Sequence, residues 1–304
     1  MLALVALLLL LLLLSTLTTA QTSISPRFSC PVNVSSADPS YLSAISSLSH
    51  GSSLTTISPR TPSQFAARTV ASKSISIGTY FHIVSTAALN GTITPAMVSA
   101  QLAALNTAYA PYLISFRLLG TEYLVNDAWA AAANASALAA LKTASRKGSY
   151  STLNVYFHSS LPNGVLGTCT LPASLGTGKI SAAVYAQDGC DVAAQSMPGG
   201  SITGYNAGKT AVHEVGHWLG LLHVFEGYAC SGLGDYVSDT PVQSTATEGC
   251  PIKPQKDSCV GQGMDGVDAV HNYMDYSTDA CYERFSTGQV QRMREIWGLF
   301  RDGK

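Results

Sequence analysis

One segment of the chain carries residues whose types and spacing could hold a metal ion: beginning at His213, it reads HEVGHWLGLLH. Residues four apart lie on the same face of a helix, so His213 and His217 can direct two imidazoles at one ion. Glu214 is rotated by about 100° from His213 and can flank the ion without binding it. Gly220 can adopt backbone angles that end a helix, which lets His223 return as a third ligand. Three neutral imidazoles leave a fourth zinc position open for water, as in a catalytic rather than a structural zinc site.

These residues predict hydrolysis by an activated water. Zinc held by three histidines lowers the pKa of a bound water toward neutrality. Glu214 would take the proton as general base and pass it to the leaving group. The alternative is a buried helix that carries histidines by chance. Average residue usage makes the five fixed positions a coincidence expected in about one chain in 10⁴.

A second motif, Asn-Tyr-Met-Asp-Tyr, lies downstream at residues 272–276. It resembles the Met-turn of the metzincins, a class of zinc endopeptidase that also carries H-E-x-x-H-x-x-G-x-x-H. The stretches 211–221, 235–241 and 272–281 are similar to the pappalysin-type branch, and within it to small secreted fungal members. This specific resemblance covers roughly residues 185–290.

The resemblance implies an α+β fold with two unequal lobes: a mixed twisted sheet with the active-site helix, then an irregular, disulfide-bonded C-terminal subdomain. It also implies that Tyr276 assists catalysis, since a phenol can donate a hydrogen bond to a developing oxyanion. A packed core tyrosine is the alternative. Met274 would pack its thioether beneath the histidines and shape the floor of the site.

Two finer properties are suggested by relatives. Asp235, Asp239 and Thr240 lie in a stretch that resembles a calcium-holding loop, and hard oxygen ligands suit calcium; solvated acidic residues are the alternative. In some relatives an Asp just before the cysteine that follows the Met-turn favours basic residues after the cut. That position is Ala280 here, with Asp279 beside it, so this preference is not carried over.

The N-terminal part reads as targeting and processing sequence. Residues 2–14 are almost entirely Leu, Ala and Val and are followed by small residues, which indicates a signal peptide over residues 1–20. An uncleaved anchor is the alternative, but the run is shorter than the ~20 residues that span a bilayer. Residues 21–73, rich in Ser, Thr and Pro, are predicted to form a propeptide or flexible lead-in. Residues 74–304 would then form the catalytic domain.

Seven cysteines in a secreted chain suggest three disulfides and one remaining thiol, and spacing alone leaves the pairing open. The resemblance implies two interleaved bridges, which leaves a third pair; the expected disulfides are Cys230–Cys259, Cys250–Cys281 and Cys169–Cys190.

Cys30 is the candidate for the remaining thiol. In metzincin precursors a propeptide cysteine often binds the zinc in place of water, and a thiolate is a strong zinc ligand. The family's usual form has Gly after this cysteine, whereas this chain has Pro31. An ordinary bridge or an idle thiol is the alternative. Arg60 and Arg68 are plausible processing points.

Composition limits the partners. The net charge is −1 and no Lys or Arg cluster stands out, which argues against nucleic acid. No later segment is apolar enough for stable membrane association. The sequons at Asn33, Asn90 and Asn134 suit a secreted glycoprotein, and we expect a monomer.

Periodicity and capping residues predict the elements in order. We expect strands at Thr79–Ser85, Ile114–Leu119, Thr152–His158 and Ile180–Tyr185, and helices at Thr94–Tyr109, Asp127–Lys147, from Lys209, and at Thr287–Phe300 with Ser286 as cap.

The leading interpretation is a secreted, extracellular zinc metalloendopeptidase, made as a zymogen, that hydrolyses proteins or peptides. A secreted non-catalytic binding protein that retains the fold is one rival, although Glu214 argues against it. A zinc hydrolase acting on small molecules is the second. The sequence identifies neither the natural substrate nor the cleavage preference.

Overall fold

The computed structural model describes residues 28–32, 34–49, 73–174, 181–262 and 266–304. The helices are α2 (Pro39–Ser49), α3 (Pro95–Tyr109), α4 (Asp127–Ala130), α5 (Ala135–Ser145), α6 (Ala182–Gln187), α7 (Lys209–Trp218) and α8 (Thr287–Ile296). The strands are β1 (Ile75–Ser85), β2 (Ile114–Val125), β3 (Leu153–His158), β4 (Gly167–Cys169) and β5 (Cys190–Ala193).

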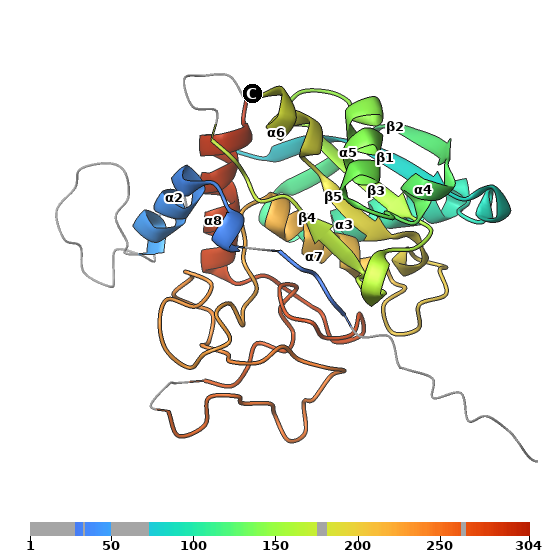
Figure 1. Cartoon of the computed structure of the whole chain (residues 1–304). Helices are drawn as coiled ribbons and strands as arrows, with labels where there is room; N and C mark the ends of the chain where they lie inside the picture. Colours follow the sequence, from blue (N-terminus) through green and yellow to red (C-terminus); the bar gives the residue numbers. More distant parts are fainter. Residues whose placement is uncertain (1–27, 33, 50–72, 175–180, 263–265) are drawn as a thin grey trace, which may run out of the picture.

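The strands form one sheet in the order β2-β1-β3-β5-β4 (Figure 1). All neighbours are parallel except β4, which runs antiparallel to β5 at one edge. Every residue of the central strand β3 is buried, as expected for a strand covered on both faces. The predicted α+β class with a mixed sheet is confirmed.

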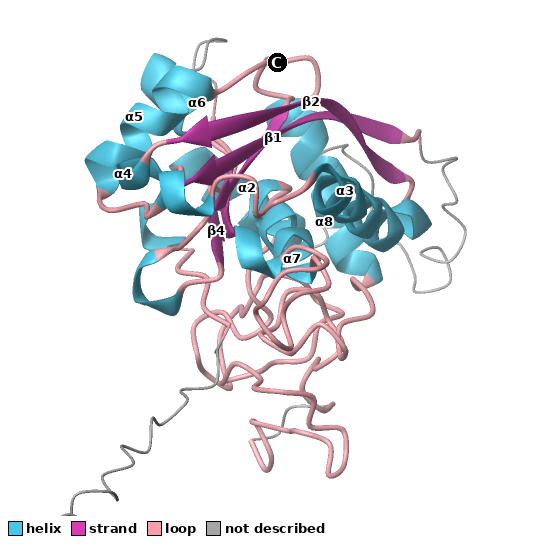
Figure 2. Cartoon of the chain, turned by 90° about the vertical axis from the view of Figure 1, so that its right-hand side faces the viewer, coloured by secondary structure: helices cyan, strands magenta, loops and turns pink. Residues whose placement is uncertain are grey.

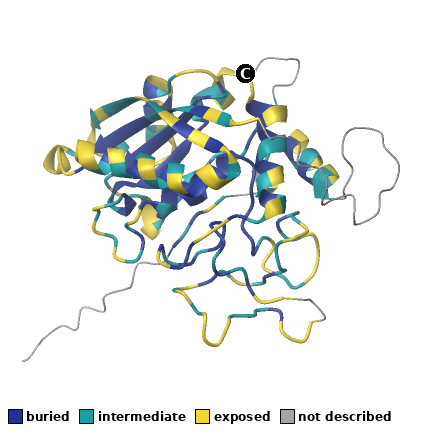
Figure 3. Cartoon of the chain, turned by 180° about the vertical axis from the view of Figure 1, so that it is seen from behind, coloured by how far each residue is buried: buried dark blue, intermediate teal, exposed yellow. Residues whose placement is uncertain are grey.

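The sheet and helices occupy one half of the molecule and loops occupy the other (Figure 2). Between α7 and α8 the described chain has no further helix or strand, only turns and isolated bridges. Burial is concentrated in the strands and in the helices packed on them, while the loop half shows many exposed residues (Figure 3). Helix α7 lies where the two halves meet, so residues on it can face both.

The N-terminal segment contains a helix that composition did not predict. Helix α2 packs beside α8 (Figure 1), with Tyr41 and Ile45 fully buried against Ile296 and Phe300. The Tyr41 hydroxyl also donates to the Gly220 carbonyl at 3.3 Å. Apolar contacts therefore order this part of the expected propeptide or flexible lead-in, although its Ser-rich sequence has a weak intrinsic preference for helix.

The strand expected at Ile180–Tyr185 is wrong. The described part of this stretch belongs to α6, whose N-terminus is capped by the Ser181 side chain accepting from the Val184 N–H. The strands of this region are instead β4 and β5, of three and four residues. Segments so short carry too few residues to show a periodic pattern.

The helix expected over Asp127–Lys147 is divided in two. Ala132 adopts a left-handed conformation with φ of 44°, and Asn134 starts α5 by accepting from the Ala137 N–H at 2.9 Å. Asparagine is among the strongest N-caps, so the break is encoded locally. No helix among the described residues has the length and apolarity needed to cross a bilayer.

Candidate active site

Helix α7 carries the first half of the motif, and its functional side chains are buried from solvent. His213, Glu214 and His217 are all 0% exposed. The helix packs against the sheet, and the Tyr109 hydroxyl of α3 donates to the Val212 carbonyl at 2.8 Å. Scaffold contacts therefore fix the rotation of α7, and with it the direction of both imidazoles.

Gly220 ends the helix and returns the chain toward the site. Its φ is +89°, a conformation that favours glycine. Its N–H donates to the His217 carbonyl at 2.8 Å, while the Leu221 N–H donates to the Gly216 carbonyl at 2.9 Å. These two bonds form a Schellman motif, after which His223 turns back beside His217.

The three histidines converge through their Nε2 atoms. His217 Nε2 lies 3.1 Å from Nε2 of both His213 and His223. The Nδ1 atoms of His213 and His217 contact the carbonyls of Tyr273 and Leu221 at 2.7 and 2.8 Å, so each Nδ1 carries the proton. Their Nε2 atoms are then unprotonated, and each offers a lone pair to a ligand.

This donor set fits a metal ion. Facing lone pairs repel unless a cation lies between them, and tetrahedral zinc would hold its nitrogen ligands about 3.3 Å apart. Burial lowers the pKa of His213 and His217 well below the usual value and that of His223 to about 3, so all three imidazoles are neutral. Cys30 Sγ joins them in a group whose ligand atoms all lie within 4.8 Å of one another.

Glu214 lies beside the same group. Its Oε2 accepts from the Cys30 thiol at 3.2 Å, and its buried Oε1 has no hydrogen-bond partner. Burial raises the pKa of Glu214 well above its usual value. A side chain at Gly167 of β4 would clash with this carboxyl group, so the edge strand needs a glycine at this position. Sequence reasoning missed Gly167, because a lone glycine carries no signal of what it faces.

Met274 lies under α7. A Cβ at Gly216 would collide with its sulfur, so glycine lets the thioether approach the helix closely. The Asn272 side chain accepts from the Met274 N–H at 2.9 Å and helps to close the turn.

Tyr276 reaches the site from the same loop. Its hydroxyl donates to the Cys30 carbonyl at 2.7 Å and accepts from the Cys30 N–H at 3.0 Å. Its ring lies 5.1 Å from that of His223 and 5.7 Å from that of His213. Burial raises the pKa of this phenol, which keeps it a hydrogen-bond donor.

The residues expected to hold calcium are only partly brought together. Asp235 Oδ1 accepts from the Thr240 hydroxyl at 2.8 Å, while its buried Oδ2 has no partner and burial raises its pKa to about 7. Asp239 instead accepts from the Ser286 hydroxyl at 2.6 Å and from the Gly288 N–H at 2.8 Å, at the start of α8.

The covalent and modification sites are distributed over the molecule. The structure holds the disulfides Cys169–Cys190, Cys230–Cys259 and Cys250–Cys281, while Cys30 is free and buried. Asn90 and Asn134 are exposed, and Asn33 lies outside the described residues.

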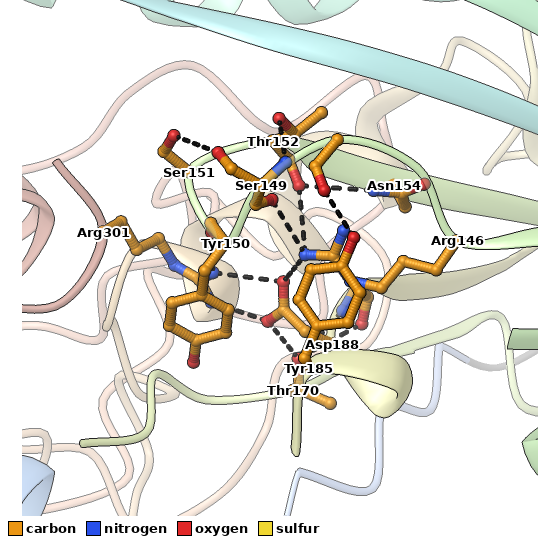
Figure 4. A network of polar contacts seen from close by, with 12 residues as sticks. Arg146, Ser149, Tyr150, Ser151, Thr152, Asn154, Thr170, Tyr185, Asp188 and Arg301 are labelled. Atoms are coloured by element: carbon orange, nitrogen blue, oxygen red, sulfur yellow. Dashed lines mark hydrogen bonds and ion pairs between the residues drawn. The ribbon is translucent and has the colours of Figure 1, made fainter. Parts of the chain in front are cut away.

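A buried ionic network behind the site was also missed by sequence reasoning (Figure 4). Asp188 accepts from Arg301 at 2.9 and 3.2 Å, from Arg146 at 2.9 Å and from the Trp218 indole at 3.1 Å. Arg301 Nε also donates to the Trp218 carbonyl at 2.9 Å. Because Trp218 is the last residue of α7, the network anchors the end of the helix that carries the histidines.

Comparison with known proteins identifies the relatives of this site. Residues 146–297 match the family described as pregnancy-associated plasma protein-A. An extracellular metalloprotease of Pyricularia oryzae is 50% identical over 232 residues, covering 76% of this chain and 77% of its own. One from Neurospora crassa is 48% identical over 233 residues, covering 76% and 78%. The chain belongs to the pappalysin family of metalloproteases.

Solved structures agree with this assignment. Mature mirolysin of Tannerella forsythia, in complex with a cleaved peptide, is 28% identical with a TM-score of 0.62, covering 74% of this chain and 92% of its own. A promirolysin mutant is 25% identical with a TM-score of 0.58, covering 77% and 84%. This metalloprotease is thus an extracellular peptidase with a metzincin fold, and its family implies a bound metal.

Proposed function

We propose that this metalloprotease is a zinc-dependent endopeptidase that cuts extracellular proteins or peptides, with His213, His217 and His223 as zinc ligands and Glu214 as general base. The observation that carries the proposal is the convergence of three neutral imidazoles. His217 Nε2 lies 3.1 Å from Nε2 of both His213 and His223. Beside them, Glu214 Oε1 is buried without a hydrogen-bond partner. Nitrogen ligands in a tetrahedral array suit zinc.

The chain's own residues divide the reaction between them. When bound, zinc supplies positive charge that lowers the pKa of the attacking water and stabilises negative charge on the substrate carbonyl. Glu214 takes the proton from that water and delivers it to the departing amine. The Tyr276 hydroxyl, which already donates to a carbonyl at this point, would donate to the developing oxyanion.

The same geometry supports a latent precursor. The Cys30 thiol is buried among the three histidines and contacts Glu214, so it takes the space that water needs. Its backbone also occupies both hydrogen-bonding positions of the Tyr276 hydroxyl. Removal of the segment before residue 74 would free both catalytic groups at once.

A calcium ion near Asp235 is the accompanying proposal. The buried, unpartnered Oδ2 suits a cation ligand, and Thr240 lies beside the same carboxylate. Asp239 already accepts a hydrogen bond at the start of α8, so it could bind the calcium ion only if its carboxylate oxygens served both partners.

A digest of casein by the mature protein, with and without a zinc chelator, tests the activity, and elemental mass spectrometry counts the metal. We expect one zinc per chain and chelator-sensitive digestion. Glu214→Gln should keep the zinc and lose roughly 10²–10⁴-fold in rate, whereas the α8 surface control Glu295→Gln should match wild type. Zinc without any hydrolysis would indicate a binding protein, and cleavage of small esters alone a small-molecule hydrolase.

A further inference from the structure

The three histidines differ in the group that faces the second nitrogen of each ring, on the side away from the metal position. The Nδ1 atoms of His213 and His217 each contact a backbone carbonyl, at 2.7 and 2.8 Å. The Nδ1 atom of His223 instead faces a carboxylate, with Oε2 of Glu226 at 3.8 Å. Among the described residues, the third candidate ligand is therefore the one with an acidic side chain behind it.

The surroundings of His223 Nε2 determine which nitrogen of this ring carries the proton. Nε2 lies 3.1 Å from Nε2 of His217, where the candidate ligands converge. A nitrogen that binds a metal must offer its lone pair, so the proton of the neutral ring is on Nδ1. The Nδ1–H group is then available to donate to the Glu226 carboxylate.

Aromatic rings on two sides hold His223 in this orientation. The Phe225 ring stacks on the imidazole with a centroid distance of 4.9 Å and an interplanar angle of 9°. The Tyr276 ring meets it edge-on, at 5.1 Å and 83°. Close packing of this kind restricts rotation of the imidazole, so Nδ1 stays on the side of Glu226.

A short turn brings Glu226 to this place. Its backbone N–H donates to the His223 carbonyl at 3.0 Å. The Glu226 side chain is 23% exposed and that of His223 is 6% exposed, so the contact lies at the edge of the buried site. The ion pairs that lysines and arginines form within the described residues all involve other acids. The charge of Glu226 is thus not neutralised by another side chain.

A bound metal would strengthen this contact. At 3.8 Å the distance is longer than that of a hydrogen bond. A dication on Nε2 would withdraw electrons from the imidazole and make its Nδ1–H a stronger donor. Histidines that bind metals commonly donate this second N–H to a carboxylate or a carbonyl, which orients the ring and raises its basicity. A carboxylate does so more strongly, because it carries a full negative charge.

An orienting group has most to contribute at the third histidine. His213 and His217 belong to α7, whose hydrogen bonds fix their backbone. His223 follows the turn at Gly220 and lies in a loop, so its place relative to the other two depends on local contacts.

We infer that Glu226 is a positioning residue that helps to retain the metal: its carboxylate accepts from the Nδ1–H of His223 and strengthens the hold of that imidazole on zinc. This inference rests on the proposed zinc site. Loss of such a partner typically weakens metal affinity by 10–100-fold. Glu226→Gln, which keeps the shape and removes the charge, should therefore weaken zinc binding by roughly tenfold or more.

Competition of the mature enzyme with a chromogenic chelator for zinc measures this affinity. We expect the weaker binding of Glu226→Gln to appear without a change in the melting temperature of the metal-free protein. Glu226→Asp, which keeps the charge but shortens the side chain, should lie between wild type and Glu226→Gln. Glu283→Gln is the matched control: Glu283 Oε1 also faces a histidine, at 3.4 Å from Nδ1 of His271, but His271 is outside the converging group. This control should bind zinc as wild type does.

The outcomes separate this role from the activity. An affinity of Glu226→Gln equal to that of Glu283→Gln overturns the role of Glu226, while the zinc site stands. An affinity of Glu226→Asp below that of Glu226→Gln also overturns it, because the retained charge would then have no effect. A lower melting temperature of metal-free Glu226→Gln with unchanged affinity would assign Glu226 to stability alone. A wild-type enzyme that binds no zinc overturns the proposed function as well.

Discussion

Replacing Asp188 by Asn should be among the most destabilising single changes in this protein. Asp188 is 2% exposed and Arg301 is 0% exposed, so the pair is fully removed from water. Asp188→Asn keeps the shape but removes the charge that balances Arg301 and Arg146. Breaking a buried ion pair by removing one partner typically costs 3–5 kcal/mol, because the remaining charge stays buried. We expect a loss of about 4 kcal/mol in the free energy of unfolding.

The amide also supplies the wrong hydrogen-bonding group. Oδ2 of Asp188 accepts from Arg146, Arg301 and the Trp218 indole, whereas an Asn nitrogen at that position would face three donors. Leaving such groups unsatisfied adds to the cost. The substitution also weakens the contacts that hold Trp218, at the C-terminal end of α7.

Urea unfolding with the disulfides oxidised, followed by tryptophan fluorescence and far-UV circular dichroism, measures this loss. Glu283→Gln is the control: Glu283 pairs with Arg284 at 3.0 Å, but their side chains are 53% and 64% exposed, so the change should be below about 1 kcal/mol. A loss from Asp188→Asn no larger than that of the control would refute the reasoning.

The effect should also depend on pH in a definite direction. Burial opposes the charge of Asp188, but Arg301 and then Arg146 outweigh it and hold the pKa below its usual 3.8. The stability due to this carboxylate is therefore present above about pH 4 and is lost as the pH falls through the lower folded-state pKa. Wild type and Asp188→Asn should converge in unfolding free energy at acid pH, and a constant gap would contradict this.

Three further predictions follow from the site and its surroundings. Cys30→Ala should raise the activity of the uncut precursor roughly tenfold or more, since the thiolate competes as a ligand; unchanged activity on a quenched peptide would argue against latency through Cys30. Added calcium should raise the melting temperature of wild type but not of Asp235→Asn, and equal shifts in both would exclude a site there. Replacing Cys169 and Cys190 together by Ala should cost about 3 kcal/mol, from the loop of 21 residues that the bridge closes, and an unchanged urea midpoint would contradict it.

Local signals were sufficient to place one end of each of the helices α3, α7 and α8. Thr94 and Ser286 cap α3 and α8 through their side chains, and Gly220 ends α7. Each of these residues acts on its own few neighbours, so the sequence carries the information directly. The same holds for the spacing of the three histidines.

Three of the elements that the sequence did not predict, β4, β5 and α2, depend on distant partners. Strands β4 and β5 are short, and the Cys169–Cys190 disulfide joins these two neighbouring strands. No periodic pattern in the sequence encodes this pairing. Helix α2 gains its order from the apolar faces of α8.

The packing of α2 has a consequence for maturation. Tyr41 and Ile45 hold the N-terminal segment against the C-terminal part of the chain through contacts in one buried cluster with Ile296 and Phe300. A nick after Arg60 or Arg68 would therefore leave the severed fragment docked, with Cys30 still seated. Onset of proteolysis should lag behind the nick until the fragment dissociates or is itself degraded, and excess fragment added in trans should act as an inhibitor.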